Sequence, residues 1–153
     1  MRLPSFTICM FALLAACSDT TSPPDAVQGS WVEWQTVQPR GHMTRTLTFM
    51  RDNEFVFRVD FYGVYEAGNS RDSFTEIAGK YRLDDDGRLE FHAEHEKSWD
   101  AVFFGRTTQK SQVSYTLFDE CTFSISGSVL TLSYISYPGD GPEPTVMHLE
   151  RKY

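Results

Sequence analysis

The sequence predicts an all-β fold, and three observations carry that prediction. From Gln28 onward, short runs rich in Phe, Tyr, Trp, Val and Thr alternate with Gly, Asp, Asn and Pro, the composition of strands and turns. Apart from a short turn near 65–67, no window keeps a helical stripe of apolar residues. Hairpin spacing dominates, so we expect a single antiparallel up-and-down β-barrel of about eight strands, with a two-sheet sandwich as the alternative. Closure into a barrel removes the exposed edges of an open sheet.

The first 16 residues have the layout of a secretory signal peptide. One positive charge, Arg2, precedes an apolar run of 11 residues from Phe6 to Ala16, which is too short for a membrane-spanning helix of about 20. The sequence Leu14-Ala15-Ala16-Cys17 resembles the lipobox of bacterial lipoproteins. That resemblance implies that Cys17 becomes the N-terminus and is acylated with palmitate-type chains. A plain secretory signal without lipid is the alternative.

Residues 17–27 are polar and contain proline, and they are expected to form a flexible tether behind the acylated cysteine. The remaining residues, 28–153, are expected to form one domain. Ser18, in place of an aspartate after the cysteine, resembles the pattern of Gram-negative lipoproteins that are forwarded to the outer membrane. We therefore expect a lipid-anchored protein of the bacterial cell envelope that faces the periplasm.

The expected mature chain is acidic and keeps one cysteine for its folded domain. Removing residues 1–16 leaves 13 Lys and Arg against 21 Asp and Glu, a formal net charge of −8. That charge, without a basic tract, argues against nucleic acid as a partner, and anionic headgroups would repel the domain. Cys121 can form no intramolecular disulfide, and its apolar neighbours favour a buried thiol over a reactive one.

The first five strands follow from alternation and from the turns between them. They are expected at residues 31–37, 45–51, 55–62, 77–83 and 89–93. The third is the clearest, because Phe55 and Phe57 fall on one side of it while Arg58 and Asp60 fall on the other. Tight turns are expected at 51–54 and at 85–87, where Asp-Gly is a strong hairpin signal.

The rest of the chain predicts three or four more strands. A sixth run places Trp99, Ala101 and Phe103 on one face. The segment 113–125 supplies either one long bent strand or two short ones, and a turn at Gly127 leads to a strand over 129–135. A loop at 138–142 precedes the last strand, at 145–151.

Gly29 and Trp31 form a Gly-x-Trp pair at the start of the first strand. This pair resembles the motif that opens lipocalins and related calycin barrels, and Gly79-Lys80-Tyr81 and the turn at Gly87 look like the small lipocalin-like domains of bacterial lipoproteins. The resemblance spans most of 28–153. It implies that Trp31 closes one end of the barrel under a basic residue, Arg151 or alternatively Lys152. As a plain core aromatic, Trp31 fits the same barrel.

Motifs for catalysis or metal binding are not found. His95-Glu96 begins like a zinc-protease pattern, but Trp99 stands where the second histidine is needed. Alternation puts His92, Glu94 and Glu96 on one strand face, where they either touch a metal or form an ordinary polar face. The sequence contains neither a Gly-x-Ser-x-Gly elbow nor a phosphate loop. We therefore expect no enzyme, no catalytic residue, no metal and no cofactor.

The remaining chemistry is apolar and lies on the inward face of the expected barrel. Seven aromatic side chains are the candidate ligand-binding residues of its lumen: Phe55, Phe57, Phe61, Tyr81, Phe91, Phe103 and Phe123. An eight-stranded barrel either fills itself or holds one small ligand. We expect binding of a small apolar or amphipathic molecule. The alternative is a protein-binding module, such as an inhibitor or accessory subunit of an envelope hydrolase, that uses loops 84–86 and 138–144.

Overall fold

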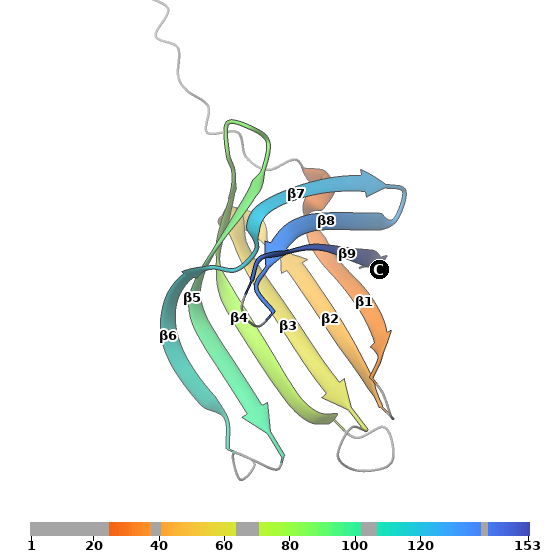
Figure 1. The fold of residues 1–153 in the computed structure, drawn as a ribbon, viewed down its shortest axis with the longest axis vertical. Coiled ribbons are helices and arrows are strands. Elements are labelled where there is room, and N and C mark those ends of the chain that lie inside the picture. Colours follow the sequence, from red (N-terminus) through yellow and green to blue (C-terminus); the bar gives the residue numbers. More distant parts are fainter. Residues whose placement is uncertain (1–24, 38–40, 64–70, 102–106, 139–140) are drawn as a thin grey trace, which may run out of the picture.

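Nine strands form one antiparallel sheet in the computed structural model, which describes residues 25–37, 41–63, 71–101, 107–138 and 141–153 (Figure 1). The strands are β1 (Gly29–Thr36), β2 (His42–Phe49), β3 (Glu54–Tyr62), β4 (Arg71–Leu83), β5 (Leu89–Asp100), β6 (Gln109–Thr116), β7 (Asp119–Ser126), β8 (Val129–Ser136) and β9 (Glu143–Lys152). Two short 3₁₀ turns, η1 (Asp25–Val27) and η2 (Arg51–Asn53), accompany them. The predicted all-β, antiparallel, barrel-like fold is confirmed.

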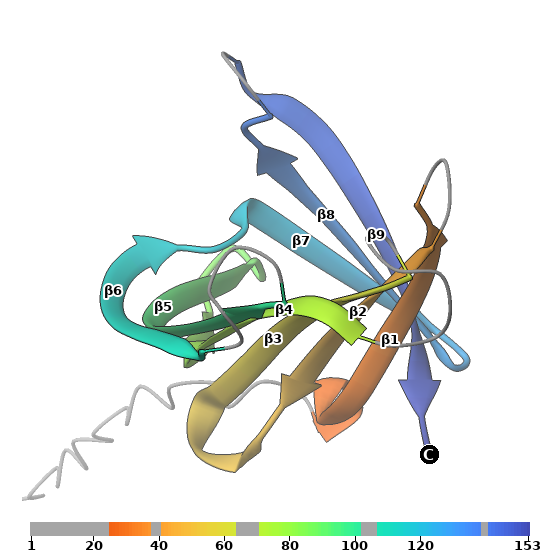
Figure 2. The ribbon, with the colours of Figure 1, turned by 90° about the horizontal axis from the view of Figure 1, so that it is seen from below.

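The sheet follows the chain as a meander with one break. Its strand order is β6-β5-β4-β3-β2-β1-β9-β8-β7, so each strand pairs with its neighbour in sequence except at β6 and β7. The sheet curls into a half-barrel, and β8 and β9 swing away from β1 (Figure 2). Only three residue pairs join β1 to β9, the last being Val32 with Glu150. We call the break between β6 and β7 the seam.

Alternation along each strand puts apolar side chains on the concave face. In β3, Phe55 and Phe57 are buried in the core while Arg58 points to the outer face. The register pairs Phe57 with Ile77 of β4, which also faces inward. Period-two patterning therefore decides which face of the sheet becomes the core.

Strand β5 differs from the prediction, because it runs unbroken to Asp100 and takes in Trp99. The separate sixth strand expected around Trp99 is wrong. A bulge explains the continuity: the pairing of β4 with β5 shifts between Gly79–Ala93 and Ala78–His95 and then resumes. Phe103 and the turn expected at 65–67 lie outside the described residues. The segment 113–125 forms parts of two strands, β6 and β7, which meet at residues 117–118.

The domain begins earlier than the sequence indicates. Val27, which the sequence analysis places in the tether, is fully buried in the core, and its carbonyl accepts a hydrogen bond from Trp31 Nε1 at 2.8 Å. The tether prediction is therefore wrong for Val27. The predicted signal peptide and Cys17 lie outside the described residues. Within the described ranges, no helix has the length and apolar character needed to cross a membrane.

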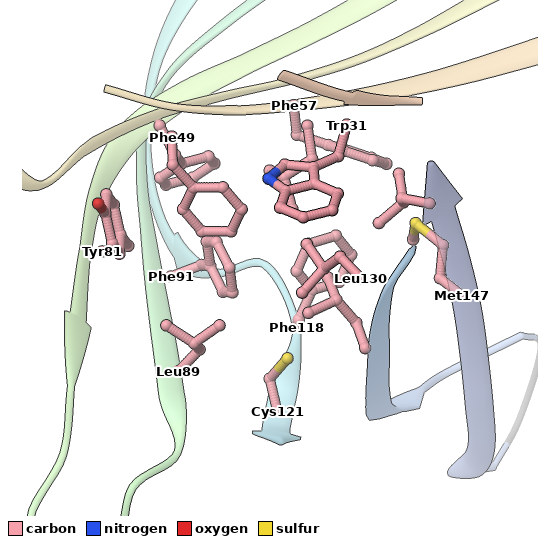
Figure 3. Packing of buried hydrophobic residues seen from close by; sticks show 14 of the residues in the cluster. Trp31, Phe49, Phe57, Tyr81, Leu89, Phe91, Phe118, Cys121, Leu130 and Met147 are labelled. Carbon is pink, nitrogen blue, oxygen red and sulfur yellow. The ribbon is translucent and has the colours of Figure 1, made fainter. Parts of the chain in front are cut away.

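The core gathers at the end of the half-barrel that carries η1 and η2. Figure 3 shows Trp31, Phe49, Phe91 and Phe118 packed together between the strands. The rings of Phe91 and Phe118 meet edge to face, with centroids 5.2 Å apart. Edge-to-face contacts stabilise the fold beyond the burial of the rings alone, so they help to hold this end of the half-barrel together.

Candidate functional site

Four of the seven predicted lumen aromatics lie in this core. Phe55, Phe57, Tyr81 and Phe91 are each at most 8% exposed and belong to one cluster. Phe55 contacts Phe91 edge to face at 5.1 Å, so the rings fill the space between them with one another. The structure therefore has a solid core where these four side chains meet.

The other three predicted aromatics are placed differently. Phe123 is half-buried and packs against the core cluster, and Phe61 is half-buried near the far end of β3. Phe103 lies outside the described residues. The structure thus brings together five of the seven side chains.

Trp31 closes the filled end, beneath the basic side chain that the resemblance assigns to it. Arg151 Cζ lies 4.3 Å from the centre of the Trp31 ring, and Arg151 Nη1 donates to the Gln28 carbonyl at 3.2 Å. The second Arg151 Nη donates to the carbonyl of Ala26. Gly29 links η1 to β1 with φ of 109°, a conformation that favours glycine. One arginine therefore holds the entering chain over the tryptophan.

A pocket of about 300 Å³ lies at the seam, between the start of β5 and the start of β7. Its apolar part comes from Leu89 and Phe91 on β5, and from Phe118 and Cys121 on the other side. Leu89 and Cys121 lie on these facing segments in Figure 3. The Leu117 amide donates to the Phe91 carbonyl at 3.0 Å, which ties the two sides together on one flank of the seam. We call this hollow the seam pocket.

The rim of the seam pocket is polar and mostly acidic. It includes Asp84, Glu90, Asp119 and Glu120, with Arg88 as the basic side chain. Asp84 Oδ1 accepts hydrogen bonds from the amides of residues 86 and 88, which fixes the β4–β5 turn beside the pocket. Asp119 Oδ2 accepts a hydrogen bond from the Tyr137 hydroxyl at 2.8 Å, while Glu120 is exposed. An apolar floor under an acidic rim suits an amphipathic molecule whose polar end is neutral or positive.

Cys121 is a buried free thiol on the seam-pocket wall. Burial raises its pKa to about 12, so the thiol stays protonated near neutral pH. The prediction of a buried rather than reactive cysteine is confirmed.

The concave face also carries a charged pair that the sequence analysis did not find. Arg45 Nη1 lies 3.0 Å from Glu33 Oε2, and their side chains are only 26% and 14% exposed. Tyr134 of β8 lies near this pair: burial raises its pKa, the charge of Arg45 lowers it, and that of Glu33 raises it. Both charges occupy positions that alternation marks as inward, so a polar side chain at an inward position is the signal that could have found them.

A second feature missed from the sequence lies on the outer face. Phe74 is 6% exposed although it points away from the core, because side chains from neighbouring strands cover it. Arg58 Cζ and Arg71 Cζ lie 4.1 and 4.9 Å from its ring centre. Trp99 stacks beside it at 6.3 Å. Both arginines also pair with Asp60, so this cluster joins β3, β4 and β5 on the convex side.

The β5 bulge separates the polar side chains that alternation had grouped as a metal site. His92 lies 3.4 Å from Ser114 on the outer face, whereas Glu96 accepts a hydrogen bond from the Tyr115 hydroxyl on the concave side. The grouping of His92, Glu94 and Glu96 on one face is therefore wrong, since the extra residue reverses the alternation. Among the described residues, no three His, Cys, Asp or Glu side chains are arranged to hold a metal ion.

Comparison of this chain with protein-family models, with curated proteins and with solved structures finds no match in any of the three. The candidate site therefore rests on the chain's own geometry.

Proposed function

We propose that this protein is a lipocalin-like lipoprotein of the bacterial envelope, anchored through acylated Cys17, that binds a small amphipathic molecule without catalysis. The seam pocket is the observation that supports binding, because it is a partly open hollow with apolar residues at its floor and a charged rim. Its volume of about 300 Å³ lies at the lower end of the range typical of small-molecule sites. The packing of Arg151 over Trp31 agrees with the lipocalin-like part of the proposal.

The chemistry of the pocket narrows the ligand class. Leu89, Phe91 and Phe118 line the pocket with only 1–4% of each residue exposed, which favours a small alkyl or aromatic group. Four carboxylates lie around the rim, and although Arg88 lies among them and Arg82 pairs with Glu90, the balance is acidic, so an anionic head group would be repelled there. We therefore expect an uncharged or cationic head.

Native mass spectrometry of the purified full chain tests the binding proposal. We expect an added mass that disappears on denaturation. Thr116→Trp places a large ring at the rim and should lower the bound fraction about tenfold, because the ring excludes the ligand from the space it needs.

Gln109→Trp is the matched control, since residue 109 is exposed, lies at the start of the same strand β6 and is outside the pocket lining. Its bound fraction should equal that of the unmodified protein. A bare mass for the unmodified protein, or equal loss in both variants, would reject the seam pocket as a binding site.

Membrane fractionation tests the anchor. Cys17→Ser removes the thiol sulfur that the resemblance to a lipobox predicts to be acylated. We therefore expect the folded domain to leave the membrane fraction almost completely. Cys121→Ser keeps Cys17 and serves as the control for loss of a thiol. Unchanged membrane retention of the Cys17→Ser variant would contradict the anchor.

A second candidate function, a protein-binding module, is favoured by one observation. Trp34 is 68% exposed on the outer face, next to His42 at 5.6 Å, and His42 stacks on Tyr62 at 4.7 Å. Exposed tryptophan and tyrosine are enriched at protein interfaces.

Cross-linking in intact cells tests this second candidate. A photo-reactive residue at position 34 should give a defined heterologous adduct that the same residue at exposed position 124 on β7 does not give. Identical adduct patterns at both positions would argue against the module.

A further inference from the structure

A separate hollow of about 370 Å³ lies on the outer face of β4, β5 and β6, away from the seam pocket. Its lining includes Ala78 of β4, His95 and Lys97 of β5, and Lys110 and Gln112 of β6, together with the carboxylate residues Glu76 and Glu96. We call it the outer hollow. Neither the proposed function nor the sequence motifs make use of it.

The β5 bulge and a small side chain create the outer hollow. The pairing after the bulge sets His95 opposite Ala78 and Gln112 opposite His95, so these three residues form one cross-strand row. Ala78 stops at its Cβ, whereas the side chains around it are long. The short side chain of Ala78 therefore leaves a depression in the outer surface, and the longer side chains around it form the walls.

Two lysines stand directly opposite each other at the border of this row. The register pairs Lys97 with Lys110, and both lie on the outer face because Lys97 Nζ approaches the outer-face residue Glu76. Like charges directly opposite on adjacent strands repel each other. Lys97 Nζ lies 5.5 Å from the centre of the Phe74 ring on β4, so the Lys97 side chain turns toward Lys110 when an anion is held between the two lysines. The bound anion then converts their repulsion into attraction.

The nearest carboxylate does not neutralise the lysine pair. Glu76 lies 3.6 Å from Lys97 Nζ, but its other oxygen lies 2.6 Å from Arg58 Nη1, so one carboxylate is shared by two cations. Within the described ranges, Lys110 makes no ion pair. Arg58 is also paired with Asp60, so this group has three cations, Arg58, Lys97 and Lys110, against two carboxylates, and Lys110 is the cation without an ion pair in the described part of the chain.

The other carboxylate next to His95 on β5, that of Glu94, lies outside the lining of the outer hollow. The hydrogen bond from Lys80 to Glu54 raises the pKa of Lys80, and the charge of Glu94 adds a smaller contribution. Glu94 therefore lies near Lys80 and outside the lining of the outer hollow. Glu96 also lines the outer hollow, but its carboxylate accepts a hydrogen bond from the Tyr115 hydroxyl on the concave side.

We propose that the outer hollow binds a phosphate group between Lys97 and Lys110, with the Gln112 amide and the His95 ring as further donors. A phosphate with two negative charges matches two ammonium groups and makes strong charge-assisted hydrogen bonds. The hollow has room for an organic substituent, so the phosphate belongs either to a lipid headgroup or to a free phosphate species. This site is independent of the seam pocket and of the anchor.

Lysine acetylation followed by mass spectrometry tests the proposal on the purified full chain in uncharged detergent micelles. Saturating inorganic phosphate, or phosphatidic acid added to the micelles, should slow the acetylation of Lys97 and Lys110 by about tenfold, because the bound anion covers both amines. Lys152, exposed on β9, is the internal control and should react at an unchanged rate. Protection by inorganic phosphate identifies a free species, and protection by phosphatidic acid alone identifies a headgroup.

A single substitution tests whether the two lysines share one ligand. In Lys97→Gln, the protection of Lys110 should be lost, whereas Lys80→Gln, two residues along β4 from Ala78 and outside the lining, should leave it intact. The proposal is overturned if neither phosphate source protects the pair, or if all lysines are slowed equally. Persistent protection of Lys110 in Lys97→Gln would also overturn it.

Discussion

Replacing Trp31 with alanine should destabilise the folded protein by roughly 3–5 kcal/mol, the range found for large aromatic side chains removed from cores. Trp31 is fully buried, and its ring lies between the core and the Arg151 guanidinium. The substitution also leaves the Val27 carbonyl without the indole donor that lies 2.8 Å away. Denaturant unfolding followed by tryptophan fluorescence or circular dichroism measures the change.

Trp34→Ala is the matched control, because it removes the same side chain three positions further along β1. Trp34 points to the opposite face and is 68% exposed, so its loss should change the free energy of unfolding by less than about 0.5 kcal/mol. Equal effects of the two substitutions, or a shift of only a few tenths for Trp31→Ala, would remove Trp31 from its role at the closed end.

Alternation predicted the buried face correctly wherever a strand ran without interruption. Phe55 and Phe57 on β3, and Leu47 on β2, are buried as their spacing indicated. The reason is local, since successive side chains of a strand point to opposite faces and one face of this sheet covers the core. The chain order of strands also predicted the meander, because hairpin turns pair neighbours in sequence.

The alternation rule failed where a bulge shifts the register between β4 and β5. The bulge near His95 depends on a register that joins Gly79 to Ala93, and no spacing within β5 alone reveals it. The assignment of Glu96 to the same face as His92 was wrong for this reason. The ion pair of Arg45 with Glu33 was missed because inward charges are expected to be rare.

The seam pocket shows how far sequence reasoning reached toward the candidate site. Phe91 was predicted to line the barrel lumen; it is buried in the filled core and also borders the seam pocket, so the site prediction itself stays a prediction. The position of the pocket depends on which two strands fail to pair, and that follows from the curvature of the whole sheet. Curvature is a sum of small twists and bulges over nine strands, so the sequence of one segment does not contain it.

Gly79→Ala should destabilise the protein by about 3 kcal/mol or more, as expected for overpacking against rigid backbone. A Cβ at residue 79 would lie 1.9 Å from the carbonyl oxygen of His92 and 3.1 Å from the Cα of Ala93. Both are backbone atoms of β5 at the bulge, so they cannot move without breaking ladder hydrogen bonds on either side. Urea unfolding measures the loss, and amide hydrogen exchange should show it first in β5.

Gly141→Ala is the control, because an added Cβ at residue 141 meets no atom within 4 Å. It should change stability by less than about 1 kcal/mol, and a small gain is consistent with reduced freedom of the unfolded chain. If Gly79→Ala were as stable as this control, the bulge in β5 would not depend on the close approach of the Gly79 backbone to His92 and Ala93. Since the bulge turns His95 outward beside Ala78, the same variant should also weaken phosphate protection of Lys97 and Lys110 in whatever fraction remains folded.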